Sequence, residues 1–155
     1  MNRDFASLIE SLEPSFQSLV TMPPLRFTQL PSNVPTRGIY LFSEGNRHLY
    51  VGRTNGIKKR LQNHCRPSGT HFTATFAFRI AREDTGQLKA SYKAAGSRSE
   101  LCANAVFGPA FSTAKARVGA MDIRYVEESD AVRKALLEIY VATVLKTPYN
   151  DFDNH

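Results

Sequence analysis

This 155-residue chain lacks several features that would assign it to particular classes of protein. It has two cysteines, Cys65 and Cys102, which are too few for a disulfide framework and favour a reducing, cytoplasmic compartment. No apolar run approaches the roughly 20 residues that cross a bilayer, so we expect no membrane-spanning helix. The N-terminal stretch is interrupted by acids and lacks the apolar core of a signal peptide, so we do not expect export.

Acidic residues are also missing from one long stretch, between Gly45 and Arg82. The last 35 residues reverse this balance, with seven acids against four bases, and the whole chain has a net charge of +6. Segregated positive charge is typical of a surface that contacts phosphates, although a solvated helix face has the same composition. The acid-free stretch contains eight basic residues: Arg47, Arg53, Lys58, Lys59, Arg60, Arg66, Arg79 and Arg82.

The length and a hydrophobic content of 42% predict one soluble domain with its own core. Residues 4–21 predict one or two short helices with a break at Pro14, and the proline-rich residues 22–37 predict an extended connector. Further helices are expected at about residues 57–65, at the ambiguous stretch 72–82, in two pieces within 87–120, and at 131–146.

A β-hairpin is predicted from residues 38–43 and 48–52, which flank the turn-like Glu44-Gly45-Asn46. Pairing Tyr40 opposite Tyr50 separates aliphatic from aromatic side chains, and a shift of one residue would mix the two sets. One face would then hold Ile39, Leu41, Leu49 and Val51, and the other Tyr40, Phe42, His48 and Tyr50. A third strand is expected at residues 121–128, with Met121, Ile123 and Tyr125 facing inward.

Two of the predicted helices contain polar residues that are candidates for binding or catalysis. Arg60 and His64 are four residues apart and are therefore neighbours on the helix at 57–65. Glu138 is the only acid between Ala131 and Asn150, in a helix that is apolar nearly all round. Burying a carboxylate costs on the order of several kcal/mol unless it is paired or binds a metal. A salt bridge to Lys134, one turn earlier, is the structural alternative to metal binding.

Taken in order along the chain, these residues resemble the GIY-YIG nuclease family. Gly38-Ile39-Tyr40 matches the first signature, and Tyr50-Val51-Gly52 stands for the second with Val in place of Ile. Either tripeptide alone is weak, but the whole set over residues 38–150 is a strong compound signal. The rest of the resemblance lies in Arg53-Thr54-Asn55, in Lys59-Arg60-Leu61 followed by His64, and in Glu138 followed by Pro148-Tyr149-Asn150.

The resemblance implies an α+β fold, a GIY-YIG-like α/β sandwich in which helices flank a small three-stranded antiparallel sheet. We expect a helical extension and proline-rich connector at residues 1–37, followed by a nuclease domain at 38–155 with an enlarged helical segment at about 82–120. The implied function is a metal-dependent endonuclease that hydrolyses phosphodiester bonds in DNA. A non-catalytic nucleic-acid-binding module and an RNA-cleaving nuclease stay open as alternatives, as does a homodimer on the substrate.

The resemblance also implies roles for single residues. Tyr40 would be the general base with Tyr50 beside it, and the sequence leaves open which of the two tyrosines takes the proton. His64 would accept or relay the proton, or orient the phenol. Arg60 would contact the scissile phosphate, Glu138 would hold Mg²⁺ or Mn²⁺, and Asn150 would position the site. The residues expected to bind nucleic acid are Arg53, Lys58, Lys59, Arg66, Lys89, Lys93 and Arg98.

Overall fold

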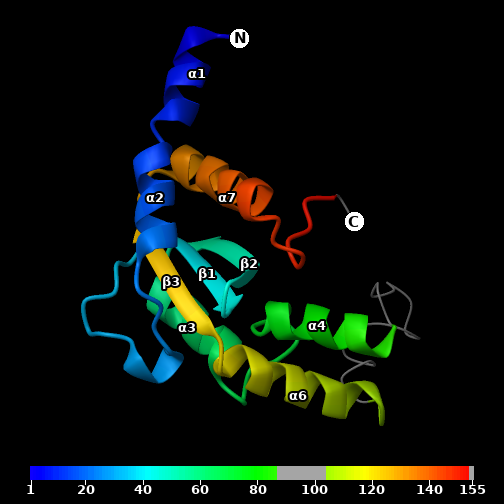
Figure 1. The fold of residues 1–155 in the computed structure, drawn as a ribbon. Helices are drawn as coiled ribbons and strands as arrows, with labels where there is room; N and C mark the ends of the chain where they lie inside the picture. Colours follow the sequence, from blue (N-terminus) through cyan, green and yellow to red (C-terminus); the bar gives the residue numbers. More distant parts are fainter. Residues whose placement is uncertain (87–103, 154–155) are drawn as a thin grey trace. The chain divides into compact units, whose positions relative to one another are not determined.

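The computed structural model describes residues 1–86 and 104–153 (Figure 1). The chain divides into two compact units, one made of Met1–Lys59 with Asp122–His155 and the other of Arg60–Met121. None of the helices in the described ranges combines the length and the apolar character needed to cross a bilayer.

The first unit contains the predicted three-stranded antiparallel sheet (Figure 1). Its strands are β1 (Gly38–Glu44), β2 (Arg47–Thr54) and β3 (Asp122–Glu127), and β1 lies between the other two. Gly45 adopts a φ of +58° in the turn between β1 and β2, a conformation that glycine takes without strain. On the far side of β3, the connector pairs with the sheet through Leu25 and Ile123.

The predicted hairpin register is wrong by two residues. Tyr40 pairs with Gly52 rather than with Tyr50, and Tyr50 pairs with Phe42. A β-carbon at position 52 would lie 2.2 Å from the Tyr40 hydroxyl oxygen, so the tyrosine ring occupies the space that the glycine leaves open. Because side chains alternate with a period of two, this even shift keeps the predicted faces for most of the hairpin.

His48 is the exception, and it does not join the tyrosines. The register changes between Phe42, which pairs with Tyr50, and Ser43, which pairs with His48, so Leu49 is an extra residue in β2. The Nδ1 atom of His48 lies 2.7 Å from the Ser43 hydroxyl oxygen. Ser43 alternates with Phe42 along β1, so the bulge places His48 with the opposite face.

Three residues of the predicted aliphatic face, Ile39, Leu41 and Val51, lie in the core cluster of the first unit, and Leu49 is buried outside that cluster. Helices α2 (Glu13–Thr21) and α7 (Ala131–Leu145) supply the side chains that pack against this face. Burial of each large aliphatic side chain stabilises the fold by about 1.5–3 kcal/mol. The buried cluster consists of Leu12, Phe16, Leu19, Ile39, Leu41, Val51, Leu137, Val141 and Ala142.

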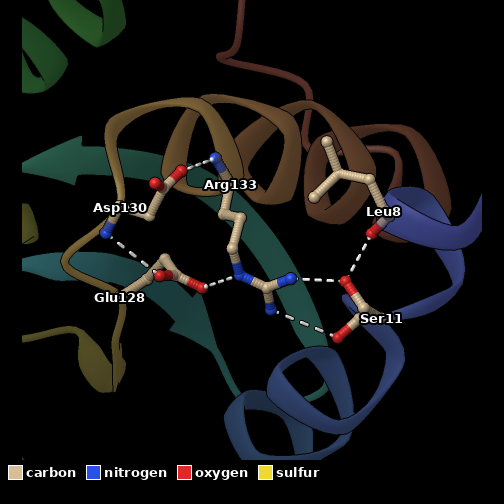
Figure 2. Close-up of polar contacts among 5 residues, drawn as sticks. All are labelled: Leu8, Ser11, Glu128, Asp130 and Arg133. Atoms are coloured by element: carbon tan, nitrogen blue, oxygen red, sulfur yellow. Dashed lines mark hydrogen bonds and ion pairs between the residues drawn. The ribbon is translucent and has the colours of Figure 1, made fainter. Parts of the chain in front are cut away.

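Arg133 ties the N-terminal helices to the start of α7, as Figure 2 shows. Its Nε donates to Glu128 at 2.9 Å, and its Nη2 donates at 3.2 Å to the carbonyl of Ser11, which follows α1 (Arg3–Glu10). The N-cap of α7 is Asp130, whose carboxylate accepts from the Arg133 backbone N–H at 2.8 Å. These contacts fix where α7 begins and therefore where Glu138 lies along it.

The described part of the second unit is helical. Helix α3 (Ile57–Cys65) begins in the first unit and ends in the second, and it matches the predicted bounds. Helix α4 (Thr75–Thr85) resolves the ambiguous stretch as helix and packs on α6 (Phe107–Gly119), which supplies one of the two expected helical pieces. Ring centroids of Phe78, Phe107 and Phe111 lie 5.1–6.4 Å apart in this interface. The short 3₁₀ helix η1 (Phe27–Gln29) belongs to the connector of the first unit.

Candidate functional site

The carboxylate of Glu138 lies beside the end of strand β2, next to Arg53. The Arg53 Nε atom is 3.0 Å from Glu138 Oε2, and the Glu138 side chain is only 16% exposed. Lys134 does not take this role, because its ammonium group donates instead to the side-chain oxygen of Asn55. The partner of Glu138 is therefore a residue of the hairpin rather than a neighbour on its own helix.

The environment of Glu138 affects its protonation in two opposing ways. Burial raises the pKa of the carboxyl group above its usual value, while the charge and the backbone N–H of Arg53 act to lower it. The net direction of the pKa shift is upward. A carboxylate that is partly removed from water is stabilised by a nearby cation, and in this structure Arg53 supplies that positive charge.

The ligand set available around Glu138 fits a hard divalent cation. Mg²⁺ is commonly held by one or two carboxylates together with water and substrate phosphates. Within residues 1–86 and 104–153, no three His, Cys, Asp or Glu side chains are grouped closely enough to enclose a metal ion. The arrangement therefore suits a cation whose shell is completed by water and phosphate, and it does not suit a closed zinc site.

The two signature tyrosines lie together on the sheet face opposite the aliphatic core. Their ring centroids are 6.2 Å apart, and Tyr40 also contacts Phe42 edge to face at 5.8 Å. Tyr40 is 1% exposed, whereas Tyr50 is half-buried. Gly52 lies under the Tyr40 ring, so the second signature shapes the space that the first one fills.

Asn150 fastens the segment after α7 to the edge strand β2. Its side-chain oxygen accepts from the Val51 N–H at 2.9 Å, and its side-chain nitrogen donates to the Val51 carbonyl at 2.7 Å. Two neighbours add to the attachment, since the Thr147 hydroxyl donates to the same Asn150 oxygen and the Tyr149 N–H donates to Leu49. Asn150 thus positions the strand that carries Tyr50 and Arg53.

Arg60 and His64 belong to the second unit, and their surroundings are well defined there. The guanidinium of Arg60 donates to Thr75 Oγ1 at 3.1 Å and to the Thr73 carbonyl at 3.5 Å. His64 is fully buried, with its ring edge to face with Phe76. Burial, and secondarily the charge of Arg60, lowers the pKa of His64 to about 3. The imidazole is therefore neutral at physiological pH.

The residues predicted to bind nucleic acid fall into three groups. Lys58, Lys59 and Arg66 are exposed. Arg53 is half exposed but is also the partner of Glu138. The remaining three, Lys89, Lys93 and Arg98, lie outside the described residues, as does Cys102.

Two residues of this region were not singled out from the sequence as part of the site. Lys134 is 7% exposed and contacts Asn55, which connects α7 to the segment between β2 and α3. The one available signal was a lysine placed four residues before Glu138 on an otherwise apolar helix. Gly52 was identified only as part of a signature. The Tyr40 ring packs over it, which can be recognised only once the observed pairing of Tyr40 with Gly52 is known.

Comparison with known proteins gives a family match and one short sequence match. The family described as the GIY-YIG catalytic domain matches residues 37–150. UvrABC system protein C of Aquifex aeolicus (strain VF5) is 45% identical over 40 residues, which make up 25% of this chain and only 7% of that protein. No solved structure matches the chain.

The family match extends from the residue before the first signature to the asparagine that fastens the end of the chain to β2. It includes both tyrosines, the arginine and histidine of α3, and Glu138. The three-stranded sheet flanked by helices is the fold that the resemblance implied. Since the match covers well over half of the sequence, this chain belongs to the GIY-YIG family.

Proposed function

We propose that this protein is a metal-dependent endonuclease that hydrolyses phosphodiester bonds in DNA. The observation that carries the proposal is the position of Glu138. It is a largely buried carboxylate held against the end of the strand that also presents Tyr50. A protein that only binds nucleic acid needs cations on its surface, but it does not need a buried carboxylate beside them.

The tyrosines supply the group that takes a proton from water. A free phenol has a pKa near 10, so it acts as a base at neutral pH only where its surroundings favour the phenolate. We assign this role to Tyr40, with Tyr50 beside it at the observed ring distance of 6.2 Å. Neutral His64 has a lone pair that can accept a hydrogen bond from a hydroxyl group and so orient it.

Arg60 is suited to hold a phosphate in a fixed orientation. Its contacts with Thr73 and Thr75 set the plane of the guanidinium and use two of its five N–H groups. A planar guanidinium fork matches two phosphate oxygens, so a fixed plane favours one orientation of the substrate. This positioning reduces the entropy that the bound phosphate must lose during the reaction.

Glu138 would hold Mg²⁺ or Mn²⁺, and the bound cation would stabilise charge on the departing 3′ oxygen. Glu138 itself is kept in place by Arg53 and by its position two turns into α7. Asn150 holds strand β2 against the segment that follows α7 through its two hydrogen bonds to Val51. It is therefore a positioning residue in this proposal.

The function is tested with supercoiled plasmid incubated with the purified chain and Mg²⁺, Mn²⁺ or a chelator. Glu138→Gln and Tyr40→Phe should each abolish nicking. Tyr140→Phe and Glu127→Gln are matched controls, because Tyr140 contacts Glu13 and Glu127 is exposed at the end of β3. Both controls should cleave like the wild type.

The same assay separates the alternatives. Duplex, single-stranded, flapped and branched DNA are tested next to RNA of the same sequence. Cleavage of RNA alone would replace DNA with RNA as the substrate. Binding without cleavage of any of these nucleic acids would favour the non-catalytic module and contradict the nuclease proposal. Normal cleavage by Glu138→Gln would contradict the metal role while leaving the enzyme class standing.

A further inference from the structure

Phe72 stands out from the surface of the second unit. Its side chain is 73% exposed, and it lies in the segment between α3 and α4. Single exposed apolar residues are common in soluble proteins, so exposure alone says little about function. The support of this segment and the charge around it are what distinguish Phe72.

The segment that carries Phe72 is held by a dense set of hydrogen bonds. The Thr70 N–H donates to Thr73 Oγ1 at 2.8 Å, and the Thr73 N–H donates back to the Thr70 carbonyl at 3.0 Å. The Phe72 N–H itself donates to Thr70 Oγ1 at 3.3 Å. The ring therefore projects from a turn with a defined backbone conformation.

The base of the segment is fixed from the other side by α6. The ammonium group of Lys115 donates to the carbonyls of Pro67 and Gly69 at 2.8 and 2.9 Å. Gly69 is packed so closely that a β-carbon would lie 2.8 Å from the Asn63 carbonyl and 2.9 Å from the Ala74 β-carbon. The exposed ring thus stands on a rigid support, and a ligand that contacts it need not first order the segment.

The surroundings of Phe72 favour a polyanion. The segment lies within the acid-free stretch from Gly45 to Arg82, and Arg66 is exposed at its start. The ring of His71 packs against that of Phe72 with a centroid distance of 4.0 Å. The other two strongly exposed phenylalanines in the described part of the chain are Phe5, which follows Asp4, and Phe152, which lies between Asp151 and Asp153.

We propose that Phe72, backed by His71, is a stacking site for an unpaired nucleobase. An exposed aromatic ring in a basic segment is one means by which proteins bind single-stranded nucleic acid, because every base has a π face. The proposal rests on the proposed function, in that the bound polyanion is the DNA to be cleaved. It narrows the substrate class to DNA with an unpaired or unstacked base.

Binding is measured by fluorescence anisotropy with labelled DNA in the presence of a chelator, so that no strand is cut. Phe72→Ala and Phe72→Leu should each weaken binding to gapped or single-stranded DNA by about 10-fold, while intact duplex binding changes little. Phe72→Trp should retain affinity because it preserves an aromatic face. Phe152→Ala is the matched control and should bind like the wild type.

A second readout uses the absence of tryptophan from the natural chain. The Phe72→Trp variant has a single indole, whose emission should be quenched when single-stranded DNA stacks on it. The corresponding Phe152→Trp variant should show no such quenching. This measurement does not depend on cleavage or on the metal.

The outcomes distinguish the two proposals. DNA binding with unchanged affinity in Phe72→Ala and unquenched emission in Phe72→Trp would overturn the stacking site and leave the nuclease proposal standing. Equal effects on intact duplex and gapped DNA would overturn the preference for unpaired bases. Quenched emission in a protein that cleaves nothing would support the stacking site and contradict the nuclease proposal.

Discussion

The guanidinium of Arg53 and the carboxylate of Glu138 form an ion pair at the junction of β2 and α7, with Nε 3.0 Å from Oε2. From the sequence, Arg53 was predicted to bind nucleic acid and Glu138 to bind a metal ion. Their contact means that a cation bound by Glu138 would compete with Arg53 for the same carboxylate. It also means that a metal at Glu138 would release Arg53 toward a phosphate.

Removing the Arg53 charge should therefore tighten metal binding by the free protein. The Arg53 side chain is half exposed, so the pair contributes only about 0.2–1 kcal/mol. We therefore expect Arg53→Gln to bind Mn²⁺ about 1.4- to 5-fold more tightly. Mn²⁺ binding is followed by electron paramagnetic resonance without DNA. Lys58→Gln removes an exposed charge nearby in the sequence and is the control. Equal Mn²⁺ affinity in Arg53→Gln and the wild type would contradict the competition.

Gly52→Ala should displace the Tyr40 ring. The added β-carbon would lie 2.2 Å from both the Cζ and the hydroxyl oxygen of Tyr40, so the ring must move. We expect a loss of about 1–3 kcal/mol in the free energy of unfolding and a fall in kcat of about 100-fold. Gly56→Ala is the matched control, since its nearest neighbour would be 3.9 Å away. Urea denaturation and plasmid nicking measure the two effects, and unchanged activity in Gly52→Ala would rule out a catalytic need for this ring position.

Asn150→Ala should loosen the edge of the sheet. It removes the hydrogen bonds to both backbone groups of Val51 and leaves these groups without their side-chain partner. We expect a loss of about 1–3 kcal/mol in stability. Hydrogen exchange at the Val51 amide should accelerate, which a change confined to the C-terminal segment would not produce. Asn33→Ala, at an exposed position in the connector, should leave this amide unchanged.

The local spacing of apolar residues was sufficient to predict the helices and strands, but it was not sufficient to predict how the strands pair. Helical spacing and capping residues placed α3 and α7 correctly, because both signals depend on residues within a few positions of each other. A period of two separates the faces of a strand but does not distinguish even shifts, so the pairing of Tyr40 with Gly52 was missed. The bulge at Leu49 is a one-residue insertion that the alternation of side chains did not indicate.

The contacts of the candidate site depend on residues that are distant in the sequence. Nothing in the pattern around Arg53 indicates that Glu138 is its partner, although the isolation of Glu138 indicated that it needed one. The burial of His64 was also not predictable, because a histidine four residues after an arginine is more often on a helix surface. Its depth is a property of the packing of the second unit rather than of α3 alone.

The buried His64 should make the protein less stable in mild acid. Burial lowers the pKa of His64 in the folded protein to about 3, whereas a histidine in an unfolded chain has a pKa near 6.5. Between these values the unfolded state binds one more proton, so stability is fully present above pH 6.5 and is lost as the pH falls toward 3. The loss approaches about 1.4 kcal/mol per pH unit, or about 2 kcal/mol between pH 7 and pH 5.

The measurement compares urea denaturation at pH 7, 6 and 5 for the wild type and His64→Asn. Burial and Arg124 also lower the pKa of His48, which adds a loss of stability in acid to both proteins. The difference between the two proteins therefore isolates His64.

The variant should be the less stable protein at pH 7, because it loses packing against Phe76, and its disadvantage should shrink as the pH falls. Parallel pH profiles for the wild type and His64→Asn would show that His64 has the same pKa in the folded and unfolded states, and the lowered pKa of the buried imidazole would then be wrong.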